Sequence, residues 1–430
     1  MLKSATSEII PVGLITTCKI ILGFFVLKLS GSYLTAAEFG VLGQFMTLVA
    51  IVNMISSAGI STGLTSALCK FKSPLSKDKL IAASIKNSFV VFVVTLLSVL
   101  FFGPQISYFF FDNRIPLISI YLFPLIGLFS ALAAIVQSVL IEKKRTFTLL
   151  ILNVSGSVLG GITFGSSIYF NHLNGAIWGS MLLITINGLL SILLWKNTGI
   201  SSIVCLARYK TYRYQRYLLP FCISTLFGSL FFPMALISIR TIISKQVNWQ
   251  IVGEWTAVLR ISDAYMQFLG LLLVAYVLPK FSRLRSQPDQ HIKMLVRMML
   301  EVTCIFLPIL IFVFVAKKHI FKIIFNYSTT DIDQLFMWQV AGDLIRCEFS
   351  ILVYFWLSQS NTKLVMINEV AQGLIILCSY SLISISVPGS ITAVQSYFLT
   401  YTILLFLGFI VTMKSIIHKK KSIKWVNEFP

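Results

Sequence analysis

The sequence predicts an all-α, polytopic membrane protein with about 12 transmembrane helices in two halves of six. Of its 430 residues, 57% are hydrophobic and only 12% are charged, whereas a soluble domain carries roughly 25% charged residues. Apolar runs of 18 or more residues recur along the whole chain, and each can cross a hydrocarbon core of about 30 Å as a helix. The basic residues between these runs alternate in number from one connector to the next, as expected for loops on opposite sides of a membrane.

The apolar runs and the polar residues between them place the individual spans. We expect spans near residues 9–30, 40–62, 86–108, 115–141, 147–170, 174–195, 217–243, 254–279, 295–316, 334–358, 363–386 and 391–413. The connectors are short, so the sequence leaves no room for a large extramembrane domain.

The distribution of lysine and arginine predicts the orientation of the chain. With a cytoplasmic N-terminus, the cytoplasmic segments hold 25 lysines and arginines, the opposite face holds 6, and 4 lie within spans. This bias predicts that both termini are cytoplasmic. It also accounts for the net charge of +20, so we expect no nucleic-acid partner.

Equal numbers of spans on either side of one long basic connector suggest an internal repeat with a substrate cavity between the halves. We therefore predict an N-terminal six-helix bundle over 1–196, a basic cytoplasmic connector over 197–216, a C-terminal bundle over 217–414 and a basic cytoplasmic tail over 415–430.

Several function classes lack their sequence signals. The seven cysteines are scattered and no Cys/His spacing suits a metal, so we expect neither a disulfide framework nor a metal site. The chain has no GxxxxGK[ST] loop for ATP. It has no loop long enough for a polymerase active site, and no cleavable signal peptide is expected. These absences favour a transporter over an enzyme, with no catalytic residues and no cofactor.

Two lysines in the first span are candidates for substrate binding. An ionisable group near mid-bilayer costs roughly 2.5–3.5 kcal/mol and usually faces the bundle interior or a watery cavity. Lys19 lies near the middle of the span and Lys28 near its outer end. Nine residues at about 100° each place them on opposite sides of a straight helix. We favour a cavity role for Lys19, whereas Lys28 could equally reach the interface.

Further charges lie in later spans. Arg260 and Asp263 are three residues apart, as are Asp343 and Arg346, so each pair shares a helix face and can form an ion pair. Such pairs could simply lower the cost of insertion. Alternatively, the arginines could form a cationic lining, with Lys19 and Arg240, from which an anionic substrate displaces the carboxylates. Glu369 has no basic residue three or four positions away and could titrate or pair with another helix.

Two stretches rich in small residues, 56–67 and 155–167, permit close helix approach. Packing is the simplest interpretation of both.

The sequence also resembles a known family. VGEWTAVLRISDAYMQFLGLLLVAYVLPKFSRL (252–284), FMWQVAGDLIRCEF (336–349) and NEVAQG (368–373) are similar to segments of the Wzx-type polysaccharide flippases. The resemblance is strongest over about 240–375 and continues weakly at Lys19, Lys28 and SSAGI (56–60). It implies the fold of the multidrug/oligosaccharidyl-lipid/polysaccharide (MOP) exporter superfamily, with two six-helix bundles around a central V-shaped cavity.

The resemblance further implies a flippase of the bacterial inner membrane that moves an undecaprenyl-pyrophosphate-linked glycan to the periplasmic leaflet by alternating access. The glycan would be an O-antigen repeat unit of lipopolysaccharide biosynthesis, which the divergent N-terminal half favours, or lipid III of the common antigen. Polymerase and chain-length proteins of that pathway are candidate partners. The candidate pyrophosphate ligands are Lys19, Lys28, Arg240, Arg260 and Arg346, and the candidate coupling or pairing carboxylates are Asp263, Asp343 and Glu369.

Two questions stay open at this stage. The sequence does not show whether transport is coupled to protons or to sodium ions. The alternative function is a multidrug or small-molecule exporter of the same superfamily, although a cavity for organic cations should be acidic or aromatic rather than basic.

Overall fold

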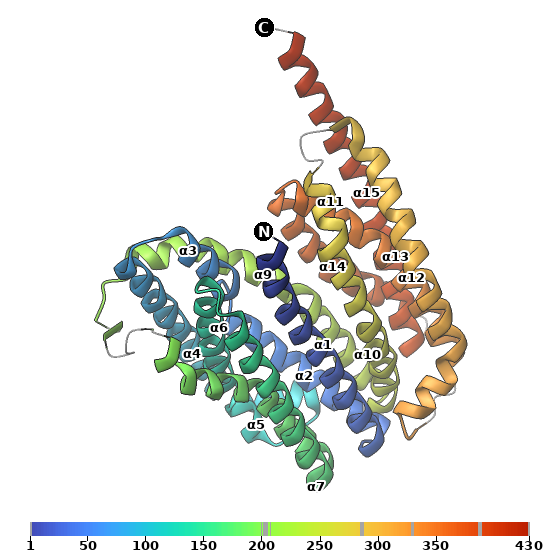
Figure 1. The fold of residues 1–430 in the computed structure, drawn as a ribbon. Coiled ribbons are helices and arrows are strands. Elements are labelled where there is room, and N and C mark those ends of the chain that lie inside the picture. The colour runs from blue at the N-terminus through green and yellow to red at the C-terminus, as the bar shows by residue number, and fades with distance from the viewer. Residues whose placement is uncertain are drawn as a thin grey trace. The chain divides into compact units, whose positions relative to one another are not determined.

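The computed structural model describes the backbone of residues 2–198, 200, 205–206, 208–283, 288–327, 331–385 and 389–428, with the side chains of residues 13–417 in these ranges except 228, 288 and 289. The described residues form helices and turns without a strand (Figure 1). The chain divides into two compact units, Met1–Pro233 and Met234–Pro430.

The described part of the first unit contains five long helices and several short ones, besides the start of α9. Its elements are α1 (Leu2–Tyr33), α2 (Ala36–Ser56), the π-helix η1 (Ile60–Leu64), α3 (Thr65–Lys70), α4 (Pro74–Phe111), α5 (Leu117–Tyr121), α6 (Phe123–Glu142), α7 (Thr146–Leu194) and η2 (Lys196–Thr198). The helix α9 (Tyr212–Gln246) begins in this unit and ends in the second.

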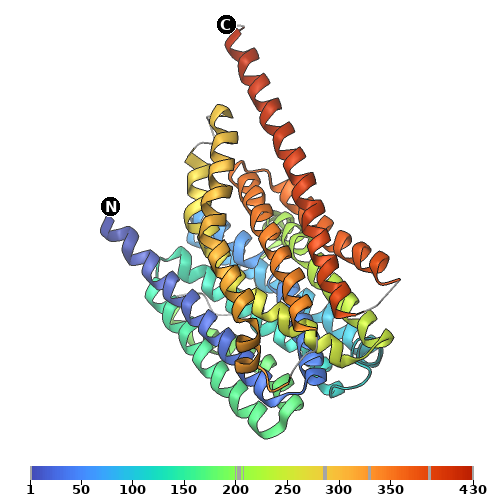
Figure 2. The same cartoon turned by 90° about the vertical axis from the view of Figure 1, so that its right-hand side faces the viewer.

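The second unit continues from α9. Its elements are α10 (Trp249–Leu272), the π-helix η3 (Leu273–Val277), α11 (Leu278–Arg283), α12 (Pro288–Ile324), α13 (Ile332–Ser358), α14 (Thr362–Ile383) and α15 (Ser390–Glu428). Figure 2 shows α15 as one long helix that ends near the C-terminus of the chain.

The described residues contain fewer separate long apolar helices than the twelve spans predicted. Ten helical stretches among the described residues are long and apolar enough to cross a membrane. One of them is α7, whose 49 residues are interrupted by non-helical backbone at Asn171 and His172, so it supplies two spans where the sequence predicted 147–170 and 174–195. The 27 residues of α13 add another span, whose charged residues lower its hydropathy. Together these give twelve within the described part of the chain.

The units divide at Pro233, inside α9, whereas the sequence suggested a division at the connector 197–216. Part of that connector (199, 201–204 and 207) lies outside the described residues, as do Met1 and the side chains of the basic tail from residue 418 on. The backbone of the predicted tail 415–430 is helical as far as Glu428. The assignment of the two units to two six-helix bundles stays a prediction.

Local sequence signals account for the ends of α2. Thr35 and Glu38 form a capping box: the Thr35 hydroxyl accepts from the Glu38 backbone N–H at 3.4 Å, and the Glu38 carboxylate accepts from the Thr35 N–H at 2.9 Å. The helix stops before Gly59, whose φ of +72° lies in the left-handed region. A Cβ at Gly59 would come within 2.5 Å of the Cys222 sulfur. A glycine is therefore required for both the turn and the approach of α9.

The small-residue stretch 155–167 packs as the sequence suggested. A Cβ added at Gly161 would lie 2.8 Å from Leu22 of α1, and one at Gly160 would lie 3.1 Å from Leu183 in the second half of α7. Both distances are shorter than ordinary van der Waals contact, so these glycines allow helices to approach closely.

One helix lies at the centre of the packing in each unit. In the first, α6 contacts α2, α3, α4 and α7; in the second, α13 contacts α10, α12, α14 and α15.

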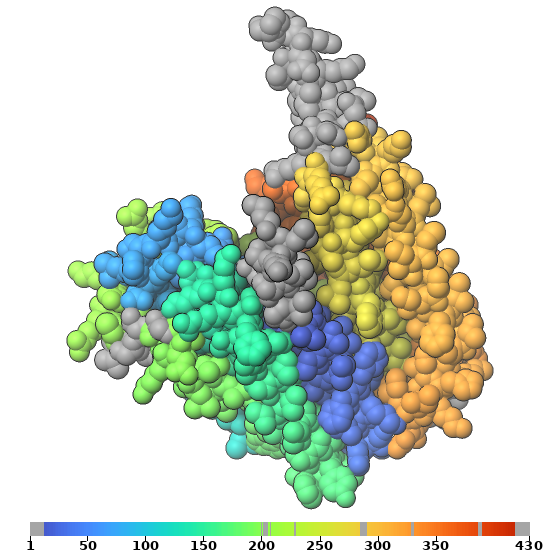
Figure 3. Space-filling view, in the orientation of Figure 1, coloured from blue at the N-terminus to red at the C-terminus, as the bar shows by residue number. Residues whose placement is uncertain are grey.

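The helix α12 instead lies at the surface of its unit. It exposes large apolar side chains such as Ile311, Phe312 and Val315, and its surface follows one edge of the second unit in Figure 3. Such a surface suits contact with lipid.

Candidate functional site

The buried ionisable side chains of the described residues all belong to the second unit. They are Arg240, Glu254, His291 and Asp343. The buried polar residues of the first unit are serines, threonines, asparagine and glutamine. Because a buried charge is costly unless it is paired or hydrogen-bonded, the surroundings of these groups indicate where a functional site lies.

Asp343, in the middle of α13, has no exposed surface. Ser262 donates a hydrogen bond to its Oδ2 at 2.7 Å, and Tyr397 donates to its Oδ1 at 2.7 Å. Tyr265 donates to Oδ2 as well, and the Gln339 amide lies 3.3 Å from Oδ1. Three helices thus supply donors to one carboxylate, which offsets part of the cost of removing it from water.

The spacing of these donors follows from helix geometry. Ser262 and Tyr265 are three residues apart on α10, and Gln339 lies one turn before Asp343 on α13, so each set shares a face. The neighbouring Gly342 lets α15 approach, because a Cβ there would lie 2.6 Å from the Tyr397 ring. A larger residue at 342 would move Tyr397 away from the carboxylate.

Arg346 lies one turn after Asp343 and reaches the same tyrosine. Its Nη1 donates to the Tyr397 hydroxyl at 3.1 Å, and its guanidinium carbon is 5.5 Å from the centre of the Tyr401 ring. Among the described residues no direct salt bridge joins Arg346 to Asp343. Tyr397 instead lies between them, accepting from the arginine and donating to the aspartate.

The helix α14 completes the surroundings of Arg346. The Gln372 amide donates to the Tyr401 hydroxyl at 2.9 Å, and Asn361 caps the helix by accepting from the Leu364 N–H at 3.3 Å. Glu369, one turn before Gln372, interacts electrostatically with Arg346. Asp263 and Asp343 act on Arg346 in the same way, so three carboxylates interact electrostatically with one guanidinium without bonding to it directly.

Arg240 and Arg260 lie close to Asp263. Arg240 is 3% exposed, and its guanidinium carbon is 5.7 Å from the centre of the Trp255 ring. It interacts electrostatically with both Arg260 and Asp263. Arg260 and Asp263 approach to 3.9 Å and are partly exposed, so this pair is long and accessible compared with the network of Asp343.

The six candidates in the second unit therefore form one connected charged network on α9, α10, α13 and α14. The other two candidates, Lys19 and Lys28, belong to α1 of the first unit, where both side chains are exposed. Lys19 has no ion pair with another described residue. No group of three or more metal-ligating side chains occurs among the described residues.

Sequence reasoning missed the aromatic and amide members of the network. Tyr397 and Tyr401 are one turn apart on α15, and that spacing was the available signal, but tyrosine pairs are common in membrane helices. Ser262 and Tyr265 lie inside the segment ISDAY that carries the family resemblance. Nothing in the sequence places α15 next to α13.

The arrangement can hold an anion. A guanidinium presents several N–H donors that match phosphate geometry. In this site two tyrosines hold Arg346 in place, and the nearby carboxylates compete for it. An anion that binds Arg346 would take the place of the nearby carboxylates as its negative partner. The hydrogen bond from Arg346 to Tyr397 could then break or shift.

Comparisons with known proteins agree with this description. Residues 33–332 match the model of a family described as polysaccharide biosynthesis protein. The chain belongs to this family. It is 23% identical over 395 residues to a lipid III flippase of Escherichia coli, an alignment that covers 90% of this chain and 93% of that protein. The same values hold for a lipid III flippase of Shigella flexneri.

Solved structures show the same fold. An inward-facing multidrug resistance MATE transporter of the MOP superfamily matches with a TM-score of 0.78 at 13% identity, covering 96% of this chain and 99% of that one. The lipid II flippase MurJ matches with a TM-score of 0.73 at 14% identity, covering 94% and 88%. The chain is thus a multi-pass membrane protein with a MOP-like fold, and its relatives are named as flippases and transporters rather than enzymes. The predicted fold class is confirmed.

Proposed function

We propose that the chain is a flippase that moves an oligosaccharide linked to undecaprenyl pyrophosphate from the cytoplasmic to the periplasmic leaflet of the inner membrane. Its family, and relatives named as lipid III flippases, support this function. The observation that carries the proposal is Arg346, which lies on the long helix α13 and is positioned by a hydrogen bond to Tyr397 and by the nearby Tyr401 ring.

The pyrophosphate is the part of such a substrate that cannot cross hydrocarbon bare. It carries about two to three negative charges, and charge-assisted hydrogen bonds from arginine can replace its water shell. In our proposal Arg346, Arg240 and Arg260 bind the pyrophosphate, and Lys19 and Lys28 act from α1. The glycan occupies aqueous volume while the polyprenyl tail stays in lipid, and alternating access moves the head group across.

The carboxylates have a complementary role in this proposal. Asp263, Asp343 and Glu369 pair with the arginines when no substrate is bound and release them when pyrophosphate arrives. Asp343 and Glu369 are also the candidate proton carriers if transport is coupled to protons rather than sodium. The proposed orientation has both termini in the cytoplasm, and the proposed substrate is an O-antigen repeat unit in preference to lipid III, with polymerase and chain-length proteins as partners.

Complementation tests the proposal. Deletion of the gene in its native host should remove the surface glycan and cause its lipid-linked unit to accumulate. Wild type should restore the glycan, whereas Arg346→Ala should restore it at least about tenfold less well at equal protein level, because a charge-assisted contact is lost. The matched control is Arg114→Ala, an exposed arginine in the connector between α4 and α5, which should complement like wild type.

Two outcomes would contradict the proposal. Unchanged glycan in the deletion strain would mean that this protein does not move that substrate. The result would favour the alternative function, a small-molecule exporter. Full rescue by Arg346→Ala would leave the flippase role intact but remove Arg346 from the binding site.

A further inference from the structure

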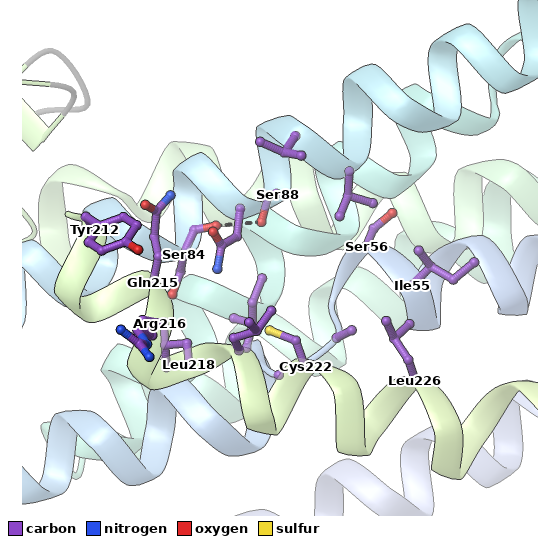
Figure 4. A pocket seen from close by; sticks show the side chains of 17 residues that line it. Ile55, Ser56, Ser84, Ser88, Tyr212, Gln215, Arg216, Leu218, Cys222 and Leu226 are labelled. Carbon is purple, nitrogen blue, oxygen red and sulfur yellow. Dashed lines mark hydrogen bonds between the residues drawn. The ribbon is translucent and has the colours of Figure 1, made fainter.

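A second candidate site lies in the first unit and shares no residue with the charged network. A cavity of about 520 Å³ opens between the end of α2, the middle of α4 and the first half of α9. Its lining residues are Ile55, Ser56, Ala58, Gly59, Ile60, Ser84, Asn87, Ser88, Val90, Val91, Tyr212, Gln215, Arg216, Leu218, Leu219, Cys222 and Leu226. Figure 4 shows Tyr212, Gln215 and Arg216 toward one end and Ile55 and Leu226 toward the other. The cavity is therefore polar at one end and apolar at the other.

The polar end offers donors to a ligand. The side chains of Asn87, Gln215 and Arg216 make no hydrogen bond or ion pair with another described residue. Arg216 is exposed and the other two are half-buried, so all three can reach a ligand. No lining residue is acidic. The hydroxyls of Ser84 and Ser88 already donate to backbone carbonyls one turn earlier, at 3.1 and 2.9 Å. The free donors are thus one guanidinium and two amides, a set suited to an anion.

Part of the apolar wall of the cavity is exposed at the surface of the unit. Val90 is 58% exposed and Leu219 is 51% exposed, so the wall of the cavity is continuous with the outer apolar surface of α4 and α9. Along α9 the stretch from Arg216 to Leu226 is about 15 Å long. This length is about half the hydrocarbon thickness of roughly 30 Å, which corresponds to one leaflet.

The polar end lies in a basic part of the unit. The start of α9 packs on α3 and α4 through Phe71, whose ring centre is 5.7 Å from that of Tyr217. Lys86 donates to the Tyr209 carbonyl at 2.8 Å, and Lys70 lies 5.8 Å from the Tyr217 ring. These lysines belong to segments that the lysine and arginine count assigns to the cytoplasmic side, where anionic lipids attract basic residues.

We propose that this cavity binds an anionic phospholipid of the cytoplasmic leaflet, with its phosphate on Arg216, Asn87 and Gln215 and one acyl chain along Val90, Val91, Leu219 and Leu226. A single cationic side chain lines the cavity, which matches the one negative charge of such a phosphate. A polyprenyl pyrophosphate, with about two to three charges, would be left undercompensated. The site is separate from the charged network of the second unit and does not depend on the proposed flippase function.

Lipid titration of the full-length protein tests this site. The purified protein is titrated with phosphatidylglycerol, with phosphatidylcholine of the same acyl chains and with undecaprenyl phosphate, and bound lipid is counted by native mass spectrometry. Wild type should bind phosphatidylglycerol more tightly than phosphatidylcholine. Arg216→Gln should weaken phosphatidylglycerol binding by about tenfold or more, because it removes the charge-assisted contact to phosphate. Asn87→Leu is a second variant, in case the first does not yield folded protein.

The matched control is Arg213→Gln, an exposed arginine on the same helix that does not line the cavity. It should retain wild-type affinity. Equal binding of the two phospholipids to wild type, or an equal loss in Arg213→Gln and Arg216→Gln, would overturn the proposal in favour of a general basic surface. Binding of undecaprenyl phosphate without phosphatidylglycerol would overturn it in favour of a substrate-related site.

Discussion

The central helices α6 and α13 have the same place in their respective units but different chemistry. Both are surrounded by neighbouring helices. From Phe123 to Ile141, α6 carries no charged residue, and its best window has a mean hydropathy of 2.2. In contrast, α13 carries Asp343, Arg346 and Glu348 in its middle. The central helix of one unit is uncharged as far as Ile141, whereas that of the other carries charges in its middle.

The two helices are accordingly stabilised in different ways. In the first unit, glycines bring helices close together. The Ser138 hydroxyl of α6 donates to the Ala134 carbonyl of its own helix at 2.7 Å and lies 3.3 Å from the Ile60 carbonyl of η1, and Ser130 of α6 donates to Asn53 of α2. In the second unit, tyrosines from other helices satisfy the charges on α13. The comparison teaches that α6 is held by close packing with a few neutral hydrogen bonds in its middle, whereas the charges in the middle of α13 need specific partners. A protein keeps such a costly arrangement where a function requires it.

The largest expected effect on stability comes from adding a side chain where α7 packs closely against α6. A Cβ at Gly188 would lie 2.5 Å from the Phe129 carbonyl oxygen, which belongs to the backbone of α6 and cannot turn aside. Gly188→Leu should therefore destabilise the protein by about 3 kcal/mol. The measurement is the fraction of monodisperse protein that remains after a heating series in detergent.

Gly23→Leu is the control for that substitution, because a Cβ at Gly23 meets nothing within 4 Å. It should behave like wild type. Equal behaviour of the two variants would show that packing around α6 tolerates extra volume, and the contrast with α13 would weaken.

An intermediate effect is expected for the tyrosine that joins Asp343 to Arg346. Tyr397→Phe removes both hydrogen bonds but keeps the ring, and should cost about 1–2 kcal/mol of stability, since a buried charged group loses a partner. Glycan export in the complementation assay should fall by about tenfold, because Arg346 loses its positioning contact. A heating series in detergent measures the loss of stability. The surface glycan level, measured at equal protein amount, measures the loss of export.

Tyr354→Phe is the matched control, as Tyr354 lies on α13 and makes no hydrogen bond with another described residue. It should leave export unchanged. Export by Tyr397→Phe at the wild-type level would mean that the hydroxyl between the two charges has no part in transport.

The smallest effect is expected at the surface of the same unit. Asp333, between the predicted spans 295–316 and 334–358, lies 3.1 Å from both Lys318 and Lys317, and these ammonium groups hold the pKa of its carboxyl below the usual range. A lowered carboxyl pKa contributes stability above the unfolded pKa, and the contribution is lost as the pH falls through the folded pKa. The carboxylate is largely exposed, so solvent screens the pairs.

Asp333→Asn should therefore leave the melting temperature at pH 7 unchanged within error. It should remove a small part of the acid-induced loss of stability below about pH 4. A clear drop in melting temperature at pH 7 would show that exposed ion pairs matter here as much as the buried network around α13.

Much of the fold followed from composition and spacing. The spans, the break within α7 and the helical character of α13 were predicted correctly, because a bilayer requires long apolar helices whatever their neighbours are. The charged candidates were also identified, since ionisable residues in apolar runs stand out. A direct ion pair between Asp343 and Arg346 was one of two alternatives that their spacing allowed, but Tyr397, 54 residues away from Asp343 in the chain, lies between them.

The sequence by itself thus determined that the chain spans a membrane, how many helices it has and which charges lie within them. Only the tertiary structure decided which side chains satisfy those charges, that Gly342 admits Tyr397, and that Asn87 and Arg216 meet at one cavity. The physical reason is that hydropathy and charge are properties of consecutive residues, whereas hydrogen-bond partners of a buried group come from whichever helix packs against it. Those neighbours are set by side-chain shape over the whole unit.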